Sequence, residues 1–385
     1  MLPSRMWKCM SGWSNYSGMV TRYEIDESKM GNRVSKSSSD LSEKVKEQRV
    51  DGSCFLSCSD QDREVKVYSN GSAKAEYQGQ ILSKSSLAKF NPRELENSSV
   101  RDSSNKPDPM FVTGFTDAEG SFMLKLNQKV QLEFGIGLHI KDLSLLMSIK
   151  DFFGVGNITT RGNVCYFSVT SLHDITSVII PHFTAYGLCT EKYGDFMLFQ
   201  QAAQIMGRKE HLTQQGRLLL CTLRASINRG LTIEGAIPAD KLSVGVIDTL
   251  NPHWVAGFTS GDGSFIAKTS LHRGKPRARI GFNISQNVRD ANLMNSLVKF
   301  FNCGNVYNNA SHNMLVFEVY DFNDAYSIIM PFFKLYPVIG VKHQDFVDWC
   351  KIVEMMLNKE HLTESGMLKI TTIKNGMNSK RGKQQ

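Results

Sequence analysis

Two carboxylates occupy the same position in a motif that occurs twice. Residues 111–122 read FVTGFTDAEGSF and residues 254–265 read WVAGFTSGDGSF, so Glu119 and Asp262 each directly precede a glycine. Two adjacent carboxylates repel one another unless a cation lies between them. Mg²⁺ prefers oxygen ligands and is often held by one or two carboxylates together with substrate phosphates. If these acids meet, the pair is suited to metal-assisted phosphodiester hydrolysis.

Both motifs are predicted to be helices that end at the acid. Asp108 and Asn251 are N-cap residues, each followed by a proline at the first helical position. Gly120 and Gly263 are the expected helix stops. A helix C-terminus is electrostatically unfavourable for an acid, so an acid there in both copies indicates a function. The alternative is that both are solvated acids at helix ends.

Small residues follow one face of each predicted helix. Gly114 and Ala118 are four positions apart, and so are Gly257 and Gly261. Residues at this spacing share a helix face, and a face without large side chains lets two backbones approach closely. We therefore predict that the two helices pack together and that both acids lie at a central seam.

The similarity extends well beyond these helices. IKDLSLLMSIKDFF from Ile140 matches VRDANLMNSLVKFF from Val288, and KEHLT from Lys209 recurs from Lys359. The matches keep their order and their spacing grows only slightly, which indicates one duplicated fold unit with short insertions in the second copy.

The fold class expected from these patterns is α+β. Two pseudo-symmetric αββαββα units each contain a curved four-stranded antiparallel sheet with helices on one face, and the motif helices join the units. In the first copy, long strands are expected at 121–126 and 130–139, a helix at 140–153, short strands at 157–160 and 164–169, and further helices at about 172–186 and 192–206. In the second copy, the corresponding ranges are 264–270, 277–286, 288–301, 305–308, 314–319, 322–335 and 342–357.

The chain is predicted to contain five regions. Residues 1–105 are polar and lack apolar periodicity, which indicates a disordered leader. The first unit is expected at 106–236, a linker at 237–250, the second unit at 251–378 and a basic tail at 379–385.

Composition narrows the class of partner. The net charge is +8 and the isoelectric point about 9.0, which favours nucleic acid or an acidic membrane surface, although a basic soluble protein without such a partner remains the alternative. No segment is apolar over the ~18 residues needed to cross a bilayer. The eight cysteines form no C-x-x-C pair and are predicted to be reduced thiols.

The motifs GFTDAEGSF and GFTSGDGSF resemble those of the LAGLIDADG homing endonucleases. The resemblance covers about residues 108–378, and it includes LMNSL from Leu293, VIGVKHQDFVDWCK from Val338 and NKEHLTESG from Asn358. It is closest to single-chain, two-motif enzymes that are encoded in fungal mitochondrial introns. The departures are Thr113, where the motif has alanine, and Ser260, which stands where the first copy has Asp117.

The resemblance implies an active site at the seam. Glu119 and Asp262 would bind Mg²⁺, as two or three ions, with help from the backbone carbonyls of Ala118 and Gly261. Lys192 and Lys342 match the position of a lysine that tunes the water network near each acid, although either could be a surface lysine at a helix start. The implied activity is a site-specific double-strand cut that promotes intron mobility, carried out in the mitochondrion.

The predicted strands would follow the major groove of double-stranded DNA. Arginine, asparagine and glutamine are the usual base-reading side chains, and loop lysines more often contact phosphates. The alternative for any single residue is a solvated strand position. The expected DNA-binding residues are Lys125, Asn127, Lys129, Gln131, Lys268, Arg273, Lys275, Arg277, Arg279 and Asn283, with Glu133 and His272 on the same faces.

Strand length predicts the target size. Strands 130–139 and 277–286 span roughly 33 Å each, and DNA rises ~3.4 Å per base pair. The two strands would therefore read about 20 pairs of a loosely palindromic site. Because one chain has both acids, it should act as a monomer.

Three alternatives stay open at this point. The same scaffold could help a host intron RNA to splice, as a maturase, or could bind DNA without cutting it, although both acids are retained. His211 and His361 could mark a second metal site. The preferred interpretation of HLT is a turn in which Thr213 and Thr363 cap the next helix.

Overall fold

The computed structural model describes residues 106–378 and residue 381, apart from residues 128, 229, 235, 246, 248, 273 and 274. These residues belong to one compact unit that contains both copies of the repeat. The predicted leader, residues 1–105, lies outside the described residues, and so does the predicted basic tail apart from Arg381.

The first half begins with the motif helix and continues into a sheet and a group of helices. Its elements are α4 (Pro109–Glu119), β1 (Gly120–Leu126), β2 (Val130–His139), η2 (Ile140–Asp142), α5 (Leu143–Phe153), β3 (Asn157–Arg161), β4 (Val164–Val169), α6 (Leu172–Asp174), the π-helical η3 (Ile175–Ile179), α7 (Ile180–Ala185), α8 (Lys192–Gly207), η4 (Glu210–Leu212) and α9 (Gln214–Ser226).

The second half repeats this order. Its elements are α10 (Pro252–Asp262), β5 (Gly263–His272), β6 (Lys275–Asn287), η5 (Val288–Asp290), α11 (Ala291–Phe301), β7 (Asn305–Asn309), η6 (Ala310–His312), β8 (Met314–Val319), α12 (Phe322–Asp324), η7 (Ala325–Ile329), α13 (Met330–Leu335), α14 (Val341–Leu357), η8 (Glu360–Leu362) and α15 (Glu364–Asn375). The duplicated α+β architecture predicted from the sequence is confirmed.

Each half contains a four-stranded antiparallel sheet, in the orders β1-β2-β4-β3 and β5-β6-β8-β7. The second hairpin is the longer one, because β5 and β6 have 10 and 13 residues whereas β1 and β2 have 7 and 10. The expected strand 277–286 therefore starts earlier, at Lys275, and ends later, at Asn287. The insertions in the second copy thus lengthen its strand ribbon.

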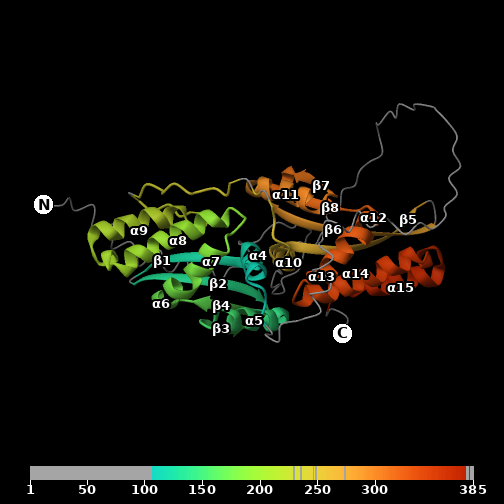
Figure 1. The fold of residues 1–385 in the computed structure, drawn as a ribbon, viewed down its shortest axis with the longest axis horizontal. Coiled ribbons are helices and arrows are strands. Elements are labelled where there is room, and N and C mark those ends of the chain that lie inside the picture. Colours follow the sequence, from blue (N-terminus) through green and yellow to red (C-terminus); the bar gives the residue numbers. More distant parts are fainter. Residues whose placement is uncertain are drawn as a thin grey trace, which may run out of the picture. The chain divides into compact units, whose positions relative to one another are not determined.

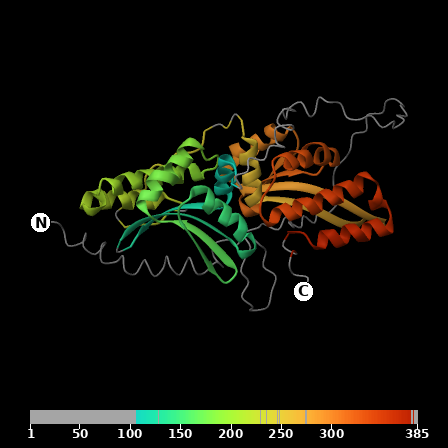
Figure 2. The same ribbon diagram turned by 60° about the horizontal axis from the view of Figure 1, so that its bottom comes forward.

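Aromatic rings bury one face of each sheet against the helices. Phe122 of β1 contacts Phe183 of α7 and Phe199 of α8, with ring centroids 5.3 Å apart in both pairs. In the second half, Phe265 of β5 contacts Phe333 at 5.4 Å and Trp349 at 5.6 Å. Alternate strand residues point into this core, which leaves the other face of each sheet open. Figure 2 shows α8 and α9 along the covered side of the first sheet.

The halves contain more helices than the predicted αββαββα string. The KEHLT segments end α8 and α14 and lead into α9 and α15. The predicted capping turn is confirmed in both copies, because Gly216 N–H donates to the hydroxyl of Thr213 and Gly366 N–H donates to that of Thr363, each at 3.0 Å. Among the described residues, no helix is long and apolar enough to cross a membrane.

Candidate active site at the helix seam

Helices α4 and α10 touch through their backbones. A Cβ atom added to Gly114 would overlap the carbonyl of Trp254, and one added to Gly257 would overlap that of Phe111. Only glycine allows this approach, so the predicted small-residue face is the surface by which the halves meet. Figure 1 shows the two helices side by side between the sheets.

The two acids lie together at the C-terminal ends of these helices. A Cβ atom on Gly261 would lie 3.4 Å from Oε1 of Glu119 and would overlap Cβ of Ala118. The Glu119 carboxylate therefore reaches across the seam to the residue that precedes Asp262. Both acids keep partial access to solvent.

Glycine directly after each acid is required by space. Gly120 and Gly263 are extended, with φ of −77° and −82°, so backbone strain does not select for glycine there. A Cβ atom on Gly120 would lie 2.9 Å from the carbonyl oxygen of Thr116, and the corresponding distance from Gly263 to Thr259 is 2.8 Å. The helix thus turns directly into the first strand, and the acid is fixed at that corner.

The charges at the seam favour a bound cation. Burial and the neighbouring Glu119 carboxylate raise the pKa of Asp262 to about 8, although Lys342 and Lys192 oppose the shift. Such a shift means that ionising both acids is costly without additional positive charge. Two close carboxylates that remain partly accessible therefore fit a divalent cation.

Both predicted lysines reach the seam. Lys192 Nζ donates to the carbonyl of Thr116 at 2.9 Å, and Lys342 Nζ donates to that of Gly261 at 2.5 Å. Burial lowers the pKa of Lys192 against the opposing effect of Asp117, Asp262 and Glu119. Lys342 is only 4% exposed. The predicted metal-ligand carbonyl of Gly261 is thus a hydrogen-bond acceptor for this lysine.

A glutamine that the sequence analysis missed completes one side of the site. Gln286 Nε2 donates to Oδ2 of Asp262 at 2.8 Å. By strand register its counterpart in the first half is Leu138, because Gly120 pairs with Ile136 and Gly263 pairs with Ile284. The sequence signal that could have identified Gln286 is its polar side chain at a strand position where apolar residues normally face the core.

The two motifs differ at Asp117, which lies at the centre of a buried hydrogen-bond network in the first half. Asp117 accepts from the N–H groups of Cys189 at 2.8 Å and Thr190 at 3.2 Å, and from Nε1 of Trp254 at 2.8 Å across the seam. Burial raises the pKa of Asp117 despite these donors. Its counterpart Ser260 accepts a single bond, from Ile339 N–H at 3.1 Å.

The open face of the first sheet combines charges with a tyrosine. Lys125 pairs with Glu133 at 2.8 Å, and the hydroxyl of Tyr166 donates to the same carboxylate at 2.8 Å. Gln131 lies opposite Lys125 on β2 and is exposed. Asn127 and Lys129 are exposed at the hairpin turn.

The open face of the second sheet is more basic. Arg279 lies 4.6 Å above the ring of Tyr320, and Lys268 lies 5.7 Å from it. Burial raises the pKa of the adjacent Glu318, against the effect of both cations.

Asn283, a predicted base contact, is only 6% exposed. Of the remaining predicted residues, Arg277 is exposed on β6, Lys275 pairs with His272 at the hairpin end, and Arg273 lies outside the described residues.

The histidines of the HLT turns belong to no metal cluster in the part of the chain that the structure describes. No group of three or more His, Cys, Asp or Glu side chains there could hold a metal ion. The Nδ1 atoms of His211 and His361 are buried without a hydrogen-bond partner. None of the five cysteines in this part forms a disulfide.

Comparisons with known proteins agree with one another. The LAGLIDADG endonuclease family matches at residues 112–203 and 255–353. "Probable intron-encoded endonuclease 3" of Neurospora crassa is 35% identical over 97% of this chain and 74% of its own length. "Uncharacterized mitochondrial protein RF1" of Saccharomyces cerevisiae is 26% identical over 70% of this chain and 60% of its own.

Solved structures of one protein match the fold closely. I-SmaMI, a LAGLIDADG homing endonuclease, has been solved bound to cleaved DNA, with 38% identity, a TM-score of 0.69, and coverage of 72% of this chain and 98% of its own. It has also been solved on an uncleaved DNA target in the presence of calcium ions, with the same identity and TM-score and coverage of 71% and 99%.

Proposed function

This chain belongs to the LAGLIDADG family of intron-encoded homing endonucleases, which cleave DNA targets, and we propose that its cut is made at the seam between α4 and α10. The observation that supports this site is the meeting of Glu119 and Asp262 at the ends of two touching helices.

The proposed metal is Mg²⁺, bound as two or three ions. Glu119 and Asp262 supply the carboxylates, with the carbonyls of Ala118 and Gly261 nearby, and DNA phosphates complete the coordination. When bound, the metal would activate a water and stabilise the leaving oxygen. The carbonyl of Gly261 would have to share its lone pairs with Lys342.

Lys192 and Lys342 are proposed to stabilise the charge that develops on the phosphate. Their ammonium groups are held by carbonyls of the motif helices, and their charges act on the same acids. Replacing either lysine by methionine should slow cleavage more than it weakens binding. A loss that appears only in affinity and shrinks at low salt would assign these lysines to phosphate contacts.

The open sheet faces are proposed to read about 20 base pairs, roughly ten for each long strand. The target should be only loosely palindromic, because the two faces differ. Lys125 and Gln131 form a cross-strand pair in the first half, where the second half has Lys268 and Arg279.

One chain supplies both acids, so the active species is a monomer. Its proposed location is the mitochondrion.

A cleavage selection tests the proposal directly. The full chain is incubated with a library of random DNA duplexes and Mg²⁺, and the cut sites are sequenced. We expect double-strand cuts at the centre of a site of about 20 pairs, and a footprint of that length with one protein bound. A stoichiometry of two, or a much shorter footprint, would contradict the duplicated-unit arrangement.

A maturase on the same scaffold is the second candidate function. The intron-encoded relatives favour it, because such a protein is made from the RNA that it would help to splice. A splicing assay with the host intron, run beside the cleavage assay, separates the two activities. Both could occur in one chain.

A further inference from the structure

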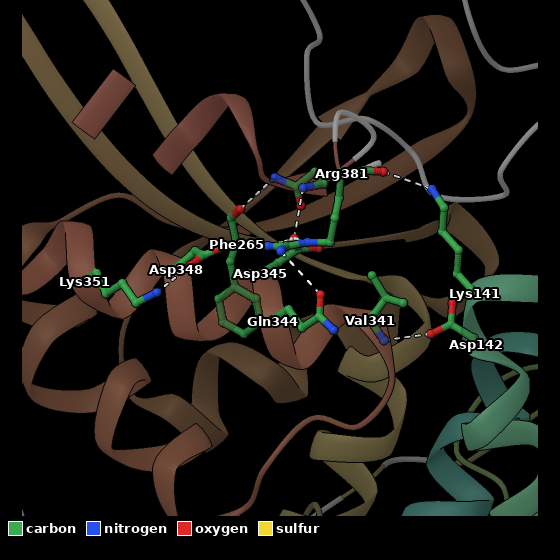
Figure 3. A network of polar contacts seen from close by, with 10 residues as sticks. Lys141, Asp142, Phe265, Val341, Gln344, Asp345, Asp348, Lys351 and Arg381 are labelled. Atoms are coloured by element: carbon green, nitrogen blue, oxygen red, sulfur yellow. Dashed lines mark hydrogen bonds and ion pairs between the residues drawn. The ribbon is translucent and has the colours of Figure 1, made fainter. Parts of the chain in front are cut away.

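Two buried aspartates tie each half of the molecule to a helix of the other half. Asp142 of the first half accepts from Val341 N–H at 2.8 Å, and Asp290 of the second half accepts from Glu191 N–H at 2.7 Å. Asp142 is 5% exposed and Asp290 is 8% exposed. Figure 3 shows the first of these ties, from the end of η2 to the start of α14.

The residue held by each tie directly precedes an active-site lysine. Val341 is followed by Lys342, and Glu191 is followed by Lys192. The bound N–H groups belong to the first turn of α14 and to the residue before α8, where helices leave donors unsatisfied. An acid that accepts from such a donor fixes the helix start and is favoured by the helix dipole. Each aspartate therefore fixes the backbone from which a lysine projects.

The same aspartates follow the strands that are proposed to read DNA. Asp142 ends the single turn η2 after β2, and Asp290 ends the single turn η5 after β6. Two residues thus separate the end of each long strand from the tying aspartate. The connection between each long strand and a helix of the opposite half is therefore short.

The chain around Val341 is shaped to admit the aspartate. Gly340 has a φ of +84°, and a Cβ atom there would lie 2.6 Å from Oδ1 of Asp142. A second set of contacts also connects η2 to α14. Lys141 Nζ donates to the carbonyl of Arg381 at 3.0 Å, and the Arg381 side chain pairs with Asp345 of α14 at 2.8 Å.

We propose that Asp142 and Asp290 are positioning residues that make the lysine of each half depend on the docking of the other half's DNA-reading strand. This rests on the proposed function. Cutting would then require both half-sites to be engaged, because a poorly seated strand would displace the lysine across the seam.

The test is the rate of cutting of each DNA strand, measured with both 5′ ends labelled at saturating protein. Asp142→Ala should give the same strand bias as Lys342→Met, and Asp290→Ala should give the opposite bias, matching Lys192→Met. Loss of a hydrogen bond to a charged group predicts that one strand is slowed about tenfold or more. Affinity for the target should change by less than about threefold.

Two further variants separate positioning from folding. Asp142→Asn keeps the acceptor oxygen and should restore near-normal cutting, whereas Asp142→Glu keeps the charge but is longer and should retain part of the bias. Asp321→Ala is the matched control. Asp321 caps α12 by accepting from Asn323 N–H at 2.8 Å, and α12 does not contain either active-site lysine. The variant should lower the melting temperature without strand bias.

The outcomes separate a failure of the proposed function from a failure of the positioning role. A full chain that cuts neither strand would refute the proposed function itself. If the full chain cuts and the Ala and Glu variants slow both strands equally, the positioning role is wrong. If an Ala variant does not fold, an unbiased Asp142→Glu variant overturns the proposal in its place.

Discussion

The two halves share their fold but contribute different side chains to the seam between α4 and α10. The first half places Asp117 in the motif helix, where it accepts from the indole of Trp254. The symmetric position in the second half is Ser260, and the counterpart of Trp254 is Phe111. On one side of the seam Asp117 of α4 meets the indole of Trp254 of α10, whereas the symmetric positions are occupied by Ser260 of α10 and Phe111 of α4.

A second pair of positions differs in the same way. Thr113 lies 3.1 Å from Nε2 of His182, whereas the corresponding residues of the second half are Ala256 and Phe332. In both comparisons a hydrogen-bonded pair is replaced at the symmetric positions by residues that cannot form the same bond, because Phe111 and Phe332 are apolar. The halves share the glycines at the seam, the lysines and the aspartate ties, whereas Gln286 beside Asp262 has Leu138 as its counterpart.

The largest effect is expected where the halves are alike. Glu119→Gln or Asp262→Asn should each lower double-strand cutting by about 10⁴-fold, or ~5 kcal/mol, because either change removes a metal ligand from a shared site. Target binding should stay within about tenfold. The measurement is single-turnover cleavage with Mg²⁺, and full cutting by either variant would contradict the site. Ca²⁺ should permit binding with little or no cutting.

The motif position that differs predicts an unequal loss of stability. Asp117→Ala should cost about 4 kcal/mol, because it leaves the buried Nε1 of Trp254 and the part-buried N–H of Cys189 without their acceptor. Ser260→Ala should cost less, about 2 kcal/mol, because its hydroxyl accepts from Ile339 N–H and donates to the carbonyl of Ala256, and both bonds are lost. Urea unfolding of both variants gives the comparison. Equal losses in the free energy of unfolding would show that the Asp117 network gives no additional stability.

The buried His182 has the non-titrating Phe332 as its counterpart, so its contribution to the pH dependence of stability has no equivalent in the second half. Burial lowers the pKa of His182 to about 4 from its usual 6.5. Between these values the unfolded chain binds more protons, so the stabilising contribution is complete above pH 6.5 and is lost as the pH falls toward 4. The full loss would be about 3 kcal/mol.

Replacing the histidine tests this assignment. The pair of changes Thr113→Ala and His182→Phe copies the second half, and it should flatten the urea midpoint between pH 6.5 and 4.5. The exposed His173, changed to glutamine, is the control and should leave the slope unaltered. An unchanged slope in the double variant would assign the pH effect to other groups.

The sequence predicts the parts of this site that are encoded locally. The repeated motif, the N-cap and proline signals and the four-residue spacing of small side chains located both helices, both acids and the face on which they meet. Helix boundaries agree closely because proline and glycine terminate them through local sterics.

The contacts between halves could not be predicted in this way. Asp142 and Val341 are distant in sequence, and nothing in either segment specifies that η2 of one half meets α14 of the other. The same holds for the bond from Trp254 to Asp117. Gln286 came closest to being predictable, since it stands in β6 at the register position where β2 has Leu138, but the strand pattern alone does not identify its partner.

The smallest effect is expected at this glutamine. Gln286 orients Asp262 through a bond of 2.8 Å, and groups that orient a metal ligand influence metal affinity. Gln286→Leu copies the first half and should raise the Mg²⁺ concentration for half-maximal cutting about fivefold, or ~1 kcal/mol. Leu138→Met, at the matching position, should leave it unchanged. Because the carboxylate itself remains, saturating Mg²⁺ should restore most of the rate. If that rate stays low when metal is saturating, Gln286 acts on the reaction itself, and the active sites of the two halves differ in their chemistry as well as in their surroundings.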